Sequence, residues 1–137
     1  MTANLAPARA RAALPLATDP GTVADRLITA AERLLDPLTR GSPIDARMLR
    51  AAMAQAFGGS DAEGLWNWKQ AYDAGEAALI LFLRRFGTAL SGRPVAARLA
   101  MMERLASLLP THTRRSQESQ ALQQFSTPLP LALVAAA

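Results

Sequence analysis

The fold of this chain depends most on residues 60–87, which read SDAEGLWNWKQAYDAGEAALILFLRRFG. Apolar and aromatic residues recur there at alternating steps of three and four, which is the spacing of one face of an α-helix. That face comprises Leu65, Trp68, Tyr72, Gly75, Leu79, Phe82 and Phe86. Both Trp residues, the only Tyr and two of the four Phe residues lie in this stretch. The sequence therefore predicts a long helix at the centre of the core.

Both ends of this predicted helix carry signals of their own. Ser60 and Glu63 have the spacing of a capping box, in which the hydroxyl and the carboxylate each accept a hydrogen bond from an otherwise unpaired backbone N–H. Arg84 and Arg85 lie in the last predicted turn, where cations stabilise the negative end of the helix dipole. Gly87 can adopt the left-handed conformation that ends many helices. We therefore expect the helix to begin at Ser60 and to end at Gly87.

A helix is also predicted before this stretch, near the start of the chain. Asp19 is the expected N-cap, and Pro20 fits the first helical position. Its apolar face runs from Val23 to Leu38. Because Pro37 disfavours helical backbone at the residue before it, we expect the last turn to end near Asp36.

Two shorter helices complete the predicted set. One begins after Asp45, which is a good N-cap, and ends at Phe57 before two consecutive Gly residues. The other extends from about Pro94 to Leu109, where Pro110 stops it. No stretch shows the period-two alternation of a strand. The predicted fold class is therefore all-α, a small bundle of about four helices whose core is made mostly by Leu, Met, Trp and Phe.

The chain divides into three parts by composition. Residues 1–18 contain Arg, Ala and Pro but no acid, and we expect them to be disordered. Residues 19–110 form the predicted helical domain. Residues 111–128 form a polar tail rich in Gln, Ser, Thr and Arg, and an apolar run, LPLALVAAA, follows at 129–137. We interpret that run as the start of a helix or strand near Pro130, and hence the chain as the N-terminal part of something longer or a gene remnant.

Composition excludes several kinds of site. The 137 residues include no Cys, so disulfides and thiolate metal sites are excluded. His112 is the only His, which removes sites built on two imidazoles, and we expect no bound metal. The net charge of +4 is compatible with a nucleic-acid partner. No apolar run approaches the roughly 20 residues that span a bilayer. We therefore expect a cytoplasmic protein with no membrane partner.

Two groups of residues are candidates for binding nucleic acid. Trp66 and Trp68 lie near the only Lys, Lys69, and could stack on bases while cations hold phosphates. Core packing of both rings is the simpler interpretation, because Trp68 lies on the apolar face of the predicted helix. The cations that this hypothesis uses are Lys69, Arg84, Arg85, Arg114 and Arg115; the last two are adjacent in the polar tail and could bind a phosphate or a carboxylate.

The polar tail ends in QQFSTP, residues 123–128. This element resembles the (G)QFxTP loop, often called motif X, of amino-methyltransferases that act on adenine in DNA. In that family the loop leads into a helix and holds the methionine end of S-adenosylmethionine. The resemblance implies that Phe125 and Thr127 lie beside this cofactor. Gln123 or Gln124 stands where the family usually has Gly, which puts the approach of the backbone at that point in doubt.

Most of the chain, from about Val23 to Ala137, resembles the N-terminal region of bacterial and plasmid-borne proteins of the strawberry-notch type. These proteins join an adenine-type DNA methyltransferase to a superfamily 2 helicase. Two segments carry the resemblance, residues 44–87 and, more tightly, residues 108–137. It implies that residues 111–137 are a linker and the start of a truncated methyltransferase domain, with DNA and the downstream methyltransferase and helicase domains as partners.

The chain lacks the motifs that perform the chemistry of such enzymes. It contains neither an FxGxG-type cofactor loop nor an (N/D)PP(Y/F) motif, and no Walker motif. We therefore expect residues 1–137 not to be catalytic alone. The alternative hypotheses are a stand-alone helical protein-interaction module, whose contact would be Leu129–Ala137, and a small nucleic-acid-binding module.

Overall fold

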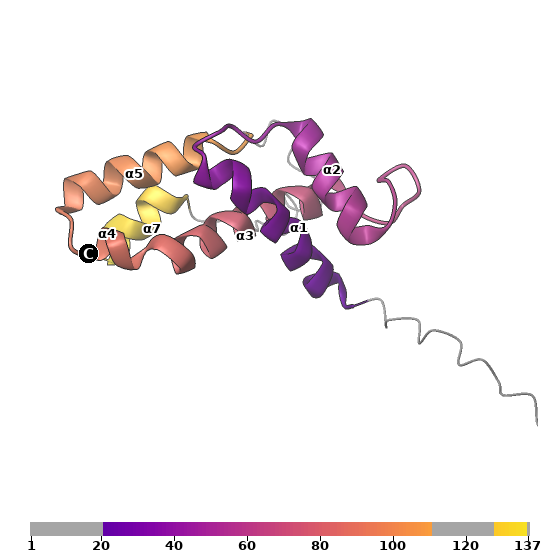
Figure 1. Cartoon of the computed structure of the whole chain (residues 1–137), viewed down its shortest axis with the longest axis horizontal. Helices are drawn as coiled ribbons and strands as arrows, with labels where there is room; N and C mark the ends of the chain where they lie inside the picture. The colour runs from indigo at the N-terminus through magenta and orange to yellow at the C-terminus, as the bar shows by residue number, and fades with distance from the viewer. Residues whose placement is uncertain (1–20, 111–127, 137) are drawn as a thin grey trace, which may run out of the picture.

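Figure 1 shows the computed structural model, which describes residues 21–110 and 128–136. All regular elements in these two ranges are helices, so the predicted all-α fold is confirmed. The segment 1–18, which was expected to be disordered, lies outside the described residues. The six helices are α1 (Val23–Thr39), α2 (Ala46–Phe57), α3 (Trp68–Phe86), α4 (Thr88–Ser91), α5 (Val95–Ser107) and α7 (Leu129–Ala136).

The first helix begins later than the sequence predicted. The N-cap of α1 is Thr22, whose hydroxyl accepts a hydrogen bond from Asp25 N at 3.2 Å, while Thr22 N donates to the Asp25 carboxylate at 2.9 Å. This complete capping box fixes the start, and the predicted N-cap Asp19 lies outside the described residues. At its other end α1 continues to Thr39, beyond the expected end near Asp36. Pro37 is buried there, so packing stabilises a turn that Pro weakens.

The central helix is shorter at its start than predicted. Gly64 has a φ of 75°, which is incompatible with a continuous right-handed helix from Ser60. Instead α3 begins at Trp68 with Asn67 as its N-cap, and Asn67 and Gln70 form the capping box. The sequence holds two capping-box spacings in succession, and the second of them starts the helix.

Ser60 and Glu63 still form the expected interaction, but within a separate turn. Ser60 N and the Ser60 hydroxyl both donate to Glu63 Oε2, at 2.6 and 2.9 Å. The end of α3 also differs from the prediction. Gly87 has a φ of −63° and a ψ of −27°, which is right-handed, and the chain passes directly into the short helix α4. The predicted left-handed end at Gly87 is therefore wrong.

Helices α2 and α5 agree closely with the predictions. The Asp45 side chain accepts a hydrogen bond from Met48 N at 2.8 Å and so caps α2. Gly58, at a φ of 80°, ends that helix in the left-handed conformation. Pro94 precedes α5, whose buried residues are Met102 and Leu105.

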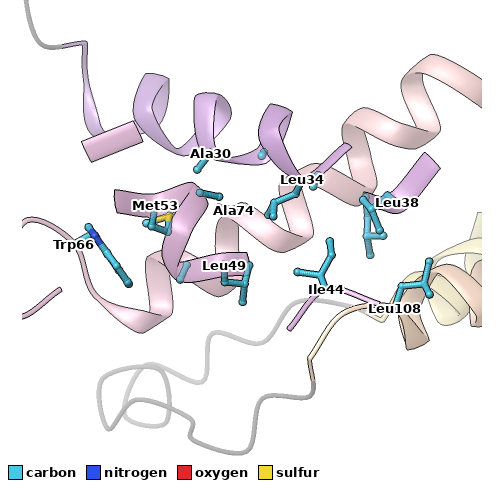
Figure 2. Packing of buried hydrophobic residues seen from close by; sticks show 14 of the residues in the cluster. Ala30, Leu34, Leu38, Ile44, Leu49, Met53, Trp66, Ala74 and Leu108 are labelled. Carbon is cyan, nitrogen blue, oxygen red and sulfur yellow. The ribbon is translucent and has the colours of Figure 1, made fainter. Parts of the chain in front are cut away.

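The largest helix–helix interface joins α1 to α3, which are not neighbours in the sequence. Alanines occupy the centre of this interface: they are fully buried and let the two helix backbones approach closely, as Figure 2 shows for Ala30 and Ala74. The core was expected to consist mostly of larger residues. Most of the buried hydrophobic residues are indeed larger, but six are alanines, namely Ala30, Ala31, Ala52, Ala71, Ala74 and Ala78.

Larger side chains fill the space around the alanines. Leu34 and Leu38 of α1 meet Leu49 and Met53 of α2, and all four are among the most deeply buried side chains (Figure 2). Helix α5 joins this core mainly through its last turns, where Leu105 and Leu108 are buried. Ile44 N donates to the Leu108 carbonyl at 2.7 Å, which ties the end of α5 to the α1–α2 loop. Helix α7 packs against α5.

Candidate functional site

The two tryptophans hold the loop between α2 and α3 against the helices. Trp66 is 3% exposed, and its Nε1 donates to the Gly59 carbonyl at 2.9 Å. Trp68 Nε1 donates to Asp61 Oδ2 at 3.1 Å. The two rings meet edge to face, with 5.7 Å between their centroids. These bonds close the loop of residues 58–67, so the aromatic cluster has a structural role.

Trp68, which the helical spacing placed in the core, is only half-buried, whereas Trp66 is buried. The reason is the later start of α3, because Leu65 and Trp66 then belong to the loop and Leu65 is 43% exposed. The Arg50 guanidinium lies 5.3 Å from the centre of the Trp68 ring, and Arg50 Nε is 4.0 Å from Asp61 Oδ1. This face of Trp68 is thus occupied by the protein's own cation, which does not favour base stacking there.

Lys69 lies on the first turn of α3 and is paired within that helix. Its Nζ is 2.8 Å from Asp73 Oδ2, one turn further along. Both side chains are partly exposed, so the pair contributes little to stability. It does neutralise the charge locally. That Lys69 binds nucleic acid stays a prediction.

Arg84 and Arg85 lie on the last turn of α3, where both are exposed. Arg93 follows α4 and is also exposed. None of the three makes an ion pair with a residue that the structure describes. From residue 77 to residue 102 the sequence contains these three cations and Arg98 but no Asp or Glu. Figure 1 shows that the end of α3, α4 and the start of α5 lie together at one end of the molecule.

We name this region the acid-free end: Arg84, Arg85 and Arg93 on the connected segment from the last turn of α3 to the start of α5. Arg93 was not among the predicted binding residues. No motif marks Arg93 in the sequence. The signal that could have indicated it is the long interval, residues 77–102, without an acidic side chain. The remaining predicted residues, Arg114, Arg115, Phe125 and Thr127, lie outside the described ranges, so their predicted roles stay predictions.

One open hollow, with a volume of about 500 Å³, adjoins the acid-free end. Its walls are formed by α1 and by the last turn of α3, and the residues that line it are Glu32, Leu35, Asp36, Thr39, Arg85 and Phe86. Asp36 pairs with Arg40 at 2.6 Å. The hollow thus brings two carboxylates toward Arg85, while Arg84 and Arg93 do not line it. The carboxylates lower the local positive potential at Arg85 relative to the other two cations.

The described residues hold no cluster of His, Cys, Asp and Glu that could bind a metal ion. None of the helices in residues 21–110 and 128–136 is long and apolar enough to cross a membrane. The chain matches no protein-family model, and no curated protein or solved structure is significantly similar to it.

Proposed function

We propose that this chain is the N-terminal helical domain of a DNA-modifying methylase/helicase of the strawberry-notch type. The observation that supports this most is the position of α7. The motif X-like residues 124–128 are followed directly by a helix that begins at Leu129, and Ala132 N donates to the Pro128 carbonyl at 3.0 Å in its first turn. The resemblance implies that a helix directly follows these residues, and α7 is such a helix.

The role of this domain is to bind and position DNA. Residues 1–137 do not transfer methyl groups by themselves. In the complete protein, Phe125 and Thr127 contact S-adenosylmethionine. A Thr hydroxyl and free N–H groups before a helix suit the carboxylate of that cofactor. The downstream methyltransferase and helicase domains supply the chemistry, in the cytoplasm.

Two measurements on residues 1–137 test this function. We expect the purified chain to bind duplex DNA with an affinity that falls steeply as salt rises, because cation–phosphate contacts release counterions. We expect no transfer of a tritiated methyl group from S-adenosylmethionine to the same duplex. Methyl transfer by this chain, or duplex binding that is absent at low salt, would contradict the proposal. The reading frame after codon 137 gives an independent test, since it should encode FxGxG and NPP-type motifs.

A stand-alone interaction module is the second candidate function. Helix α7 contains no charged residue, and its Leu131 and Val134 are 60% and 59% exposed. They lie three residues apart on one face of α7, which makes that face suitable for docking a partner. An unrelated reading frame after codon 137, together with no binding to DNA, favours this function over the first.

A further inference from the structure

The cations of the described structure differ in how far their charge is neutralised. Three of them have carboxylate partners: Arg40 with Asp36, Arg50 with Asp61, and Lys69 with Asp73. Arg33 Nη1 donates to Gln55 Oε1 at 2.7 Å and is thereby fixed against α2. Arg84 and Arg93 are held by no such interaction with a described residue, and both are exposed.

The acid-free end therefore concentrates unneutralised charge at one place. Three arginines lie there within ten residues, and the nearest acidic residues in the sequence are Glu76 and Glu103. Each guanidinium is planar and can donate two parallel hydrogen bonds to a phosphate. Arg84 and Arg85 lie on the last turn of α3, and Arg93 lies in the connection between α4 and α5. Figure 1 shows these segments at the same end of the molecule.

We propose that the acid-free end binds the phosphate backbone of duplex DNA, through Arg84 and Arg93 with a smaller contribution from Arg85. This inference rests on the proposed function and locates the DNA contact within it. Lys69 and the tryptophans are not part of the contact: Asp73 pairs with Lys69, Arg50 covers Trp68, and Trp66 is buried. Since no base-reading residue accompanies the arginines, the contact positions the domain on DNA without reading its sequence.

Exposed apolar side chains also lie on these elements. Ile80 of α3 is 56% exposed, Phe86 is 36% exposed and Val95 of α5 is 48% exposed. Arginines with apolar neighbours also suit an anionic lipid surface, whose headgroups share the phosphate chemistry. The Arg85 guanidinium lies 5.6 Å from the centre of the Phe86 ring, so part of this apolar surface is already covered by a cation. Because Arg85 covers this part of the apolar surface, we favour duplex DNA over a membrane as the partner.

The test compares two double variants of the full chain that lose the same charge. Arg84→Gln with Arg93→Gln removes the proposed contact, whereas Arg33→Gln with Arg47→Gln removes two cations from α1 and α2. Binding to a fluorescein-labelled duplex is measured by anisotropy over a series of salt concentrations. We expect the first variant to lower the slope of log K against log salt by about two, at ~0.9 per phosphate. The control variant, Arg33→Gln with Arg47→Gln, should change this slope little.

The outcomes separate this inference from the proposed function. If the unmodified chain binds no duplex, both fail. If it binds and the two variants weaken binding equally, the contact lies elsewhere and only this inference is overturned. Two duplexes of unrelated sequence should give the same change, and a change confined to one of them would contradict backbone binding. Sedimentation with vesicles that contain anionic lipid, without binding to the duplex, would assign the surface to lipid. Circular dichroism confirms that each variant is folded.

Discussion

At the scale of single residues, the turn at residues 60–63 changes the pKa of Glu63. Its carboxylate accepts hydrogen bonds from the backbone N–H and then from the hydroxyl of Ser60, and these hold the pKa of Glu63 below its ordinary value of 4.5. Because the pKa is lower in the folded state, Glu63 stabilises the fold above pH 4.5. That contribution is lost as the pH falls through the folded pKa.

We therefore predict that Glu63→Gln is less stable than the unmodified chain at pH 7, and that the difference shrinks as the pH falls below about 4.5. Urea unfolding at a series of pH values measures this difference. Ser60→Ala serves as the matched variant, because it removes the hydroxyl and keeps the backbone donor. If the difference in stability between Glu63→Gln and the unmodified chain were independent of pH, ionisation of the Glu63 carboxylate would not be the cause of that difference.

At the scale of elements, the sequence predicted which segments are helical better than where they begin. Capping of α2 by Asp45 was predicted correctly. Before α3 there were two capping-box pairs, Ser60 with Glu63 and Asn67 with Gln70, and both pairs form their hydrogen bonds. The left-handed backbone of Gly64 selects between them, and this conformation could not be inferred from apolar spacing. Because α3 begins later than predicted, Trp66 lies in the core, and Trp68 is half-buried and packs against it.

Substitution by Ala should change the stability in opposite directions at Gly75, within α3, and at Gly87, at the end of α3. Gly75 is helical, and an added Cβ would meet Leu109 Cδ2 at 3.5 Å and Leu49 Cδ2 at 3.6 Å, which are ordinary contacts. Gly75→Ala should therefore stabilise the protein by roughly 0.5–1 kcal/mol, because Ala loses less backbone entropy on folding. At Gly87 a Cβ would clash with the Leu83 carbonyl oxygen, so Gly87→Ala should be destabilising.

Urea unfolding followed by circular dichroism measures both changes at once. The two substitutions add the same methyl group, so propensity alone would move both proteins in the same direction. Opposite shifts of the unfolding midpoint are expected. A loss of stability in Gly75→Ala would mean that the chain after α5 packs more tightly on α3 than the distances indicate.

At the scale of the whole molecule, the helices do not share the core equally. Helices α1, α2 and α3 provide most of the buried residues, whereas α5 contributes chiefly through Leu105 and Leu108. The first residues of α5, including Val95, are exposed, and α7 packs on α5. Apolar residues recur at helical spacing in α5 as well, and that spacing alone did not predict the inequality. It depends on which helices meet, and the main pair, α1 and α3, is separated in the chain by α2.

Unequal sharing of the core predicts unequal stability along the chain, because a segment with few buried contacts can open without the rest unfolding. In native-state hydrogen exchange we expect amides of α1 and α3 to exchange slowest and those of α5 and α7 to exchange through a local opening. Leu105→Ala should speed exchange in α5 and α7 and change α1 and α3 much less.

Leu49→Ala is the control, because Leu49 is 1% exposed within the central core. It should lower the free energy of global unfolding by about 3 kcal/mol and speed exchange in α1, α2 and α3 together. If Leu105→Ala instead accelerated exchange equally in all helices, the described helices would unfold as one cooperative unit. The acid-free end would then be as rigid as the core. If exchange is unequal, Arg93, which directly precedes α5, adjoins an element that can adjust its position when DNA binds.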